Sequence, residues 1–351
     1  MPGTAGRPCP LPRLLPLGGA GPEDVRYDAV TDRLLTGLAD GRIVSVDPAG
    51  ADVRTVAVTG GRPLGLCPLA DGRILVCCAD QGLLRVDPAT GRKETVLREA
   101  GGKPLRVCSN AVAAPDGTLY VSDASRRFGL DHWMGDLLEH SGTGRLIRYE
   151  PGKPAEVVLD GLQFANGVAL APDASYVTVV ETGAYRLRRL WLTGPKAGTD
   201  DVLLDNLPAF PDNLSTGPDG LIWVAMVAPR DPLADLLHRT HPGVRRALWA
   251  LPPALMRGPP GPPPGSSAWT RPGGSSTICS GRAADGGPAS APPPATAWSP
   301  ASASTGAAST WAAWWSRPSP WWTCRHRGRP EAPHHTFSPA STTMPATVQA
   351  T

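Results

Sequence analysis

The sequence ADGRILVCCADQGLLRVDPATG, residues 70–91, shows the pattern that decides the fold of this 351-residue chain. It begins with a turn containing Asp71, continues with the apolar run ILVCC, turns again, and ends with a second apolar run before an Asp-Pro pair. Short apolar runs bounded by Gly, Pro and Asp are typical of β-strands joined by tight turns. We therefore interpret residues 70–91 as part of one antiparallel sheet.

The same pattern recurs along residues 20–251. Its copies begin at the turn aspartates Asp32, Asp71, Asp116, Asp173 and Asp219, so successive copies are 39, 45, 57 and 46 residues apart. Strand repeats of this period, with no helical periodicity between them, predict an all-β fold of the propeller type. The fifth copy has barely begun when the composition changes, which predicts an incomplete propeller of about four to five blades.

The longest interruption of the repeats is the sequence FGLDHWMGDLLEHS, residues 128–141. We interpret it as a short helix or as an insertion at the top of a blade. His132 and His140 flank this segment, where a titrating imidazole could act as a base. Both are also consistent with ordinary surface histidines.

The composition of the chain changes near Leu255. Residues 256–351 contain no Leu, Tyr, Asn or Lys and are crowded with Pro, Ala, Ser, Gly and Thr. Such a segment buries too little apolar surface to offset a backbone ordering entropy of roughly 1–2 kcal/mol per residue. We therefore divide the chain into an N-terminal extension (residues 1–19), a propeller (residues 20–255) and a tail (residues 256–351) that is predicted to be disordered or frameshifted.

The C-terminal region also has an unusual charge and an unusual tryptophan content. Residues 252–351 carry a charge of +5, so the rest of the chain carries −2 of the net +3. The arginines there are scattered and Lys is absent, unlike a nucleic-acid-binding arm, so no nucleic-acid partner is predicted. Trp is encoded only by TGG, and a one-base shift would turn the seven tryptophans of the tail into Val or Leu. We interpret the tail as coding sequence read in the wrong frame, which the nucleotide sequence would decide.

The N-terminal sequence MPGTAGRPCPLPRLLPLGGAG, residues 1–21, is interrupted by prolines. It lacks the apolar core of about 7–15 residues that a signal peptide needs. No apolar run in the chain approaches the roughly 18 residues of a membrane span. The cysteines form no metal-binding pattern, because Cys77 and Cys78 are adjacent and the others are isolated. These observations predict a cytoplasmic protein without a membrane span and leave its oligomeric state open.

Two polar pairs mark candidate ligands. Asn166-Gly167 and Asp212-Asn213 each precede an apolar run. Carboxylate and amide oxygens at equivalent places in successive blades can converge on one axis, where they suit a hard cation such as Ca²⁺. The alternative is structural, since Asn-Gly and Asp-Asn are also common turn formers that bond their own backbone.

Seven segments carry a family resemblance. They are GPEDV (Gly21–Val25), GGRPLGL (Gly60–Leu66), LRVCSNAVAAPDGTLYVSDAS (Leu105–Ser125), TGRLIRYEP (Thr143–Pro151), FANGVAL (Phe164–Leu170), LWLTGPKAGT (Leu190–Thr199) and FPDNLSTGPDGLIWVA (Phe210–Ala225). These segments resemble the strictosidine synthase-like family, which belongs with the paraoxonases and the SMP-30/gluconolactonase proteins among calcium-dependent propellers. The resemblance covers about residues 20–255 and implies a six-bladed propeller, here incomplete.

The resemblance also implies a metal site. The site of paraoxonases and gluconolactonases maps onto Glu23 in GPEDV, Asn110 in CSNAV, Asn166 in FANGV and Asp212 in FPDN, with Asn213 as a further ligand. The implied cofactor is Ca²⁺ or another divalent cation, whose charge two carboxylates would balance. In gluconolactonase-like members the aspartate ligand is thought to assist the attack of water, which makes Asp212 the candidate catalytic residue.

Three functions are consistent with this resemblance. The first is a metal-dependent hydrolase of lactones or related esters, acting on a small-molecule substrate. The second is a strictosidine synthase-like condensation that forms a carbon–nitrogen bond, although the glutamate that strictosidine synthases use falls late in the fold, where this chain loses the pattern. The third is a non-catalytic or inactive propeller from a truncated gene. The histidine that serves paraoxonases falls at Leu64, so a base of that kind is not expected.

Overall fold

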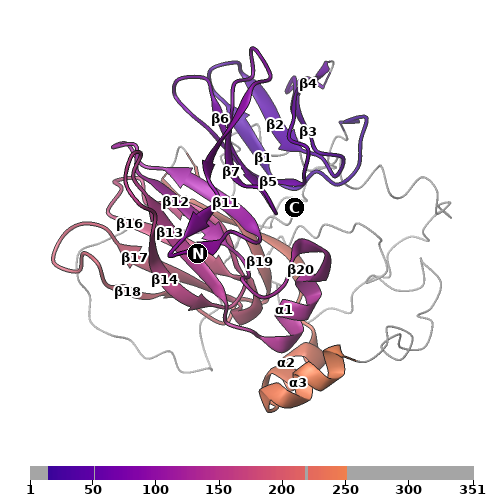
Figure 1. The fold of residues 1–351 in the computed structure, drawn as a ribbon, viewed down its shortest axis with the longest axis vertical. Helices are drawn as coiled ribbons and strands as arrows, with labels where there is room; N and C mark the ends of the chain where they lie inside the picture. Colours follow the sequence, from indigo (N-terminus) through magenta and orange to yellow (C-terminus); the bar gives the residue numbers. More distant parts are fainter. Residues whose placement is uncertain (1–14, 51, 218–219, 251–351) are drawn as a thin grey trace, which may run out of the picture.

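The computed structural model of this protein describes residues 15–50, 52–217 and 220–250. Its strands form antiparallel sheets in which sequence neighbours pair, and the first strands of successive sheets pack against one another. This arrangement confirms the predicted propeller (Figure 1). The predictions made for the tail and for Asp219 fall outside the described residues.

Four sheets have four strands each and are the complete blades. The first blade contains β1 (Val25–Asp28), β2 (Arg33–Gly37), β3 (Arg42–Val46) and β4 (Val53–Val58). The second contains β5 (Pro63–Pro68), β6 (Ile74–Cys78), β7 (Gly82–Val86) and β8 (Lys93–Leu97). The third contains β11 (Cys108–Ala113), β12 (Leu119–Asp123), β13 (Gly144–Tyr149) and β14 (Glu156–Leu162). The fourth contains β15 (Ala165–Leu170), β16 (Tyr176–Glu181), β17 (Arg186–Trp191) and β18 (Asp200–Leu204).

Two smaller sheets complete the described strands. A short hairpin of β9 (Glu99–Ala100) and β10 (Lys103–Pro104) lies between the second and third blades in sequence. A longer pair of β19 (Ala209–Thr216) and β20 (Ile222–Pro229) follows the fourth blade, and β19 packs against β15. The fifth repeat is therefore a half-blade within the described residues, as the sequence predicts.

The repeated aspartates fix the turn between the first two strands of a blade. The carboxylates of Asp71, Asp116 and Asp173 each accept a hydrogen bond from the backbone N–H two residues further on, at 3.0, 2.9 and 3.0 Å. An Asp side chain that bonds its own turn in this way stabilises the reversal of the chain. Asp71, Asp116 and Asp173 are thus structural.

The hydrophobic core consists of clusters that lie between the faces of neighbouring blades. Leu35 and Leu66 belong to the cluster between the first and second blades. Leu34 points to the opposite face of the first blade because side chains alternate along a strand. There it packs with Leu15 and Leu17, each 3% exposed. Residues 15–17 of the N-terminal extension therefore cover the outer face of the first blade.

One fully buried ion pair ties the β9–β10 hairpin to the third blade. The Arg145 guanidinium donates to Asp123 Oδ2 at 2.9 Å and to the carbonyl oxygens of Ala100, Lys103 and Pro104 at 2.7–3.1 Å. Asp123 Oδ1 also accepts two backbone N–H bonds. A buried charge is tolerated when it is paired and hydrogen-bonded in this way.

The helices gather at one place on the molecule. The interruption at residues 128–141 contains a 3₁₀ turn, η1 (Leu130–His132), and the helix α1 (Trp133–Glu139), which confirms the predicted short helix. The helices α2 (Pro232–His238) and α3 (Pro242–Trp249) pack against α1 (Figure 1). A second 3₁₀ turn, η2, spans Thr182–Ala184. Among the described residues no helix has both the length and the apolar character needed to cross a membrane.

The two C-terminal helices correct the expectation that the repeats continue as strands to residue 251. Each begins with proline in its first turn, and each has a side-chain cap at the preceding residue. Asp231 caps α2 by accepting from Leu233 N at 2.8 Å, and His241 Nδ1 accepts from Gly243 N at 3.1 Å in α3. Proline after a capping residue is a helix start signal that the strand pattern concealed.

Candidate metal centre

The five candidate ligands lie near the beginnings of the innermost strands. Glu23 directly precedes Asp24 and β1, Asn110 is in β11, Asn166 is in β15, and Asp212 and Asn213 are in β19. The two polar pairs lie inside strands, so the interpretation of them as turn formers is wrong. Both pairs lie where the pairing with the next strand shifts register, between Ala165 and Val168 and between Pro211 and Leu214.

Three of the five side chains form one hydrogen-bonded chain. Asn110 Nδ2 donates to Asn213 Oδ1 at 2.8 Å, and Asn213 Nδ2 donates to Glu23 Oε1 at 3.3 Å. The remaining two are paired, because Asn166 Nδ2 donates to Asp212 Oδ1. The negative charge of Asp212 also acts on Glu23. The structure therefore brings all five predicted residues into one cluster.

Two oxygens of this cluster are buried without a partner. Glu23 Oε2 and Asn110 Oδ1 accept no hydrogen bond within the described part of the chain. An unsatisfied buried polar atom costs about 1–3 kcal/mol, so such atoms are uncommon and call for an explanation such as an ion. Both atoms are hard oxygen donors of the kind that Ca²⁺ accepts. The residues present therefore fit the predicted divalent cation.

The ligand set is rich in amides. Within the described residues no three His, Cys, Asp or Glu side chains gather closely enough to hold a metal. A site here must therefore combine two carboxylates, from Glu23 and Asp212, with neutral amide oxygens. Calcium sites accept such mixtures, whereas zinc sites use nitrogen and sulfur ligands.

Burial and the negative charges of neighbouring carboxylates raise the pKa values of both Glu23 and Asp212. Burial, followed by the charges of Asp212 and Asp24, holds the pKa of Glu23 well above its usual range. Burial and the charge of Asp24 raise the pKa of Asp212 to about 6, against the opposing hydrogen bond from Asn166. Two crowded, desolvated carboxylates repel each other, and a bound cation would relieve that repulsion.

Two glycines allow the innermost strands to approach closely enough for the cluster to form. A Cβ atom on Gly167 would lie 2.3 Å from Leu214 N, and one on Gly65 would lie 2.7 Å from the Cα of Asn110. Backbone atoms cannot move away from such contacts as a flexible side chain can. The glycine of the Asn-Gly pair is therefore needed for strand packing, a role that the sequence did not reveal.

The sequence analysis missed three residues that surround the cluster. Ser109 Oγ donates to Asn166 Oδ1 at 2.8 Å, and Thr182 Oγ1 accepts from the same amide at 3.4 Å. Arg62 is the third: its Nη1 is buried without a partner among the described residues, and its charge acts on Glu23. The segment GGRPLGL already carried the family resemblance, so its single charged residue was the available signal.

The two histidines near α1 differ in environment. His132 is exposed, whereas His140 is partly buried against the ring of His238, with ring centroids 4.3 Å apart. Burial, then the charges of His238, Arg245 and others, lowers the pKa of His140 to about 4. Neither histidine has a recorded contact with the candidate metal centre. The structure gives no support to either as its base.

The depressed pKa of His140 predicts loss of stability in acid. Folding favours the neutral ring. The contribution of His140 to the stability of the fold is therefore fully present above its unfolded pKa of about 6.5, and it is lost as the pH falls toward 4. We expect the free energy of unfolding to fall by about 1–2 kcal/mol over this range, allowing for solvent screening. Urea titrations at several pH values measure it. His140→Asn, which suits the left-handed backbone there, should weaken the dependence, whereas His132→Asn should not. Equal pH profiles for all three proteins would contradict this role.

Known proteins similar to this chain include strictosidine synthase-like proteins. Residues 110–195 match the family model of strictosidine synthase, and residues 12–46 match that of the N-terminal region of strictosidine synthase-like proteins. Strictosidine synthase-like protein 10 of Arabidopsis thaliana is 35% identical over 243 residues, which cover 62% of this chain and 64% of that protein. Strictosidine synthase-like protein 13 of the same plant is 34% identical over 260 residues, which cover 66% and 64%. The chain therefore spans less than two thirds of the length of these relatives, and the predicted resemblance is confirmed.

A solved structure is similar in fold. A gluconolactonase from Xanthomonas campestris superposes with a TM-score of 0.51 at 18% sequence identity, covering 62% of this chain and 79% of that one. Identity at this level is evidence for the fold alone, since one fold hosts many activities. The comparison confirms the propeller architecture.

Proposed function

Since the chain resembles strictosidine synthase-like proteins in sequence and a gluconolactonase in fold, we propose that it is a metal-dependent hydrolase of lactones or related esters. One observation carries this proposal. Glu23 Oε2 and Asn110 Oδ1 are buried oxygens without a partner in the described part of the chain, and they lie in a cluster of carboxylates and amides at the starts of the innermost strands.

Five side chains would hold the cation. Glu23 and Asp212 would supply the carboxylates, and Asn110 and Asn166 would supply amide oxygens, with Asn213 beside them as a fifth ligand. Asn166 Oδ1 accepts one hydrogen bond from Ser109 and retains a second lone pair. A calcium ion bound there would polarise the carbonyl group of an ester and stabilise the negative charge that develops on its oxygen.

Asp212 would accept the proton of the attacking water. Its Oδ1 is fixed by Asn166, and its Oδ2 has no recorded partner among the described residues. As water attacks the acyl carbon, Oδ2 takes its proton and then returns it to the departing alkoxide oxygen. Leu64, where paraoxonases place a histidine, is buried in an apolar cluster with Ala79 and Phe164. Activation of water therefore depends on the carboxylate.

Arg62 would orient the substrate. Its Nη1 has unused donors, and the negative charge of Glu23 draws the guanidinium toward the cluster. A guanidinium can donate two parallel hydrogen bonds to the two oxygens of a carboxylate, or a single bond to a carbonyl or hydroxyl oxygen. This residue favours substrates that carry acceptor oxygens beside the scissile ester.

Hydrolysis of a simple δ-lactone, followed with a pH indicator, tests the proposal. We expect turnover with Ca²⁺, none after chelation, and recovery when Ca²⁺ is added back. Asp212→Asn keeps the shape of the side chain and, at saturating Ca²⁺, should lower kcat about a hundredfold or more. Asp160→Asn, at an exposed aspartate, is the matched control. A rate that survives chelation would exclude metal dependence.

The match to the strictosidine synthase model supports a second candidate, a condensation of an amine with an aldehyde. If the protein consumed an amine and an aldehyde after treatment with a chelator, and hydrolysed no lactone, this activity would be favoured. A chain that binds Ca²⁺ but turns over neither class would instead be a non-catalytic propeller.

A further inference from the structure

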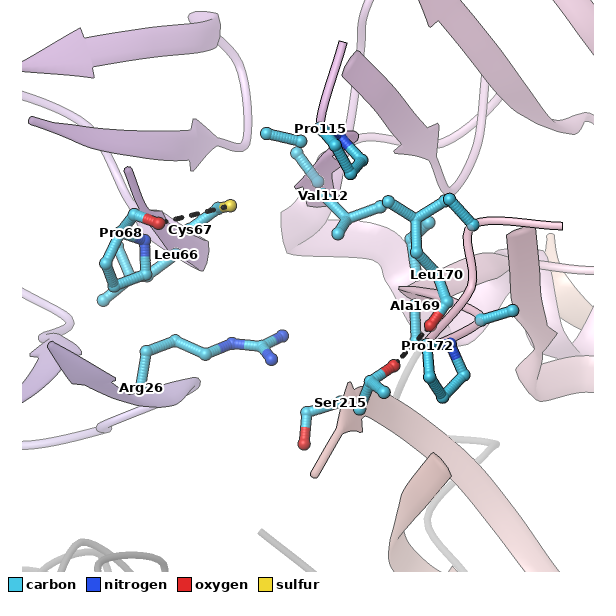
Figure 2. Close-up of a pocket in the computed structure, with 16 residues that line it drawn as sticks. Arg26, Leu66, Cys67, Pro68, Val112, Pro115, Ala169, Leu170, Pro172 and Ser215 are labelled. Atoms are coloured by element: carbon cyan, nitrogen blue, oxygen red, sulfur yellow. Dashed lines mark hydrogen bonds between the residues drawn. The ribbon is translucent and has the colours of Figure 1, made fainter. Parts of the chain in front are cut away.

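A cavity of about 350 Å³ lies at the other end of the innermost strands. The candidate ligands precede or begin these strands, whereas the cavity is lined by their later residues, such as Leu66, Val112, Leu170 and Ser215. Figure 2 shows the Arg26 side chain extending from the first blade into this space, toward Leu170 and Pro172. The cavity is thus separate from the candidate metal centre.

The walls are apolar and carry one charge. Most of the sixteen lining residues are Ala, Val, Leu or Pro. Arg26 is the only charged residue among them. Cavities of a few hundred Å³ with apolar walls and a few directed polar groups are typical of small-ligand sites.

The Arg26 guanidinium is held in place and still has free donors. Its Nε donates to Asp24 Oδ2 at 2.9 Å, and its Nη2 donates to Leu214 O at 2.9 Å. Its Nη1 has no recorded partner within the described part of the chain. The side chain is only 15% exposed. Its position is therefore organised before any ligand arrives.

One serine hydroxyl in the wall of the cavity is covered by protein. Ser215 lines the cavity, and its Oγ is buried without a partner among the described residues. The neighbouring hydroxyl differs, because Thr216 Oγ1 donates to Leu170 O at 2.5 Å. The cavity thus offers one free cationic donor, Arg26 Nη1, and has in its wall a covered hydroxyl that lacks a partner among the described residues.

We propose that this cavity binds a small monocarboxylate with a hydrocarbon body. Its carboxylate accepts a hydrogen bond from Arg26 Nη1 and a second from Ser215 Oγ once that side chain turns toward the ligand. Its hydrocarbon part packs against Leu66, Val112 and Leu170. At about 30 Å³ for each water-sized atom, the volume holds roughly ten non-hydrogen atoms. Octanoate has this size and chemistry. This site does not depend on the proposed hydrolase activity.

Calorimetric titration of the full chain with octanoate tests the site. We expect saturable binding of octanoate and none of octylamine, whose positive charge would face Arg26. Arg26→Gln should weaken octanoate binding at least tenfold, because a charge-assisted hydrogen bond is lost. Ser215→Ala should weaken it about threefold to tenfold and should not harm folding, since its hydroxyl has no partner to lose.

Two controls locate the binding. Thr178→Val also removes a buried hydroxyl without a partner, but outside the cavity, and should leave octanoate binding unchanged. An Asn166→Ala/Asp212→Ala variant should likewise keep it. Absence of octanoate binding to the parent, or equal binding to the parent and Ser215→Ala, would overturn the proposal. Loss of binding in the Asn166→Ala/Asp212→Ala variant would place the carboxylate at the metal centre instead and would also overturn it.

Discussion

An Asn166→Ala/Asp212→Ala variant is expected to bind Ca²⁺ at least about a hundredfold more weakly than the parent, a loss of roughly 2.7 kcal/mol. The two side chains come from the adjacent strands β15 and β19 and share a hydrogen bond. Removing them takes one carboxylate and one amide oxygen from the cluster. Glu23 alone would then have to balance a divalent charge. Calorimetric titration of both proteins with Ca²⁺ measures the change.

The stability of this variant separates loss of the site from loss of the fold. Asp212 raises the pKa of Glu23 through charge repulsion, so removing Asp212 removes that repulsion from the metal-free protein. We expect the metal-free variant to unfold at no lower urea concentration than the metal-free parent. Asp160→Ala, which removes an exposed carboxylate, should leave Ca²⁺ affinity unchanged. Equal Ca²⁺ affinity in the double variant and the parent would exclude the proposed site.

Gly167→Ala is expected to destabilise the protein by about 3 kcal/mol or more. The added Cβ would lie 2.3 Å from Leu214 N and 2.6 Å from Asp212 O, both backbone atoms. The strands β15 and β19 must therefore separate, which also moves Asp212 away from Asn166. For a domain of this size, thermal unfolding should shift downward by roughly 6–12 °C. Differential scanning calorimetry measures the shift.

Gly129→Ala is the matched control for this substitution. Gly129 has an extended backbone, and a Cβ there would have no heavy atom within 4 Å. Its unfolding temperature should stay within about 2 °C of the parent, as expected for a surface substitution. If Gly167→Ala were as stable as Gly129→Ala, close packing of the innermost strands would not be what requires glycine at this position.

Local sequence signals predicted most of the blade architecture. The turn aspartates were visible because an Asp side chain bonds a backbone group only two residues away, as Asp116 does with Thr118. The short helix at residues 128–141 was visible as a break in that pattern. The helices α2 and α3 were missed because their packing partner, α1, is about a hundred residues earlier: Arg245 Nε donates to Glu139 O across 106 positions.

The candidate site, like the fold, was predicted only in part from the sequence. The identities of Glu23, Asn110, Asn166, Asp212 and Asn213 came from family-like segments of the sequence. Their mutual contacts did not, because Asn110 and Asn213 are 103 positions apart and Asn213 and Glu23 are 190 apart. No local pattern shows which oxygens remain unpartnered after such groups meet. Arg62 and Ser109 were overlooked for this reason.

The sequence by itself determined that this chain forms strand repeats with bonded turns, and it determined which side chains could bind a hard cation. Both depend on interactions within a few residues or on the chemistry of single side chains. Only the tertiary structure decided that the polar pairs lie inside strands, that Gly65 and Gly167 permit close approach, and that Arg26 lines a cavity separate from the candidate metal centre. These features arise where successive blades pack around one axis, and that packing brings together residues that the chain keeps far apart.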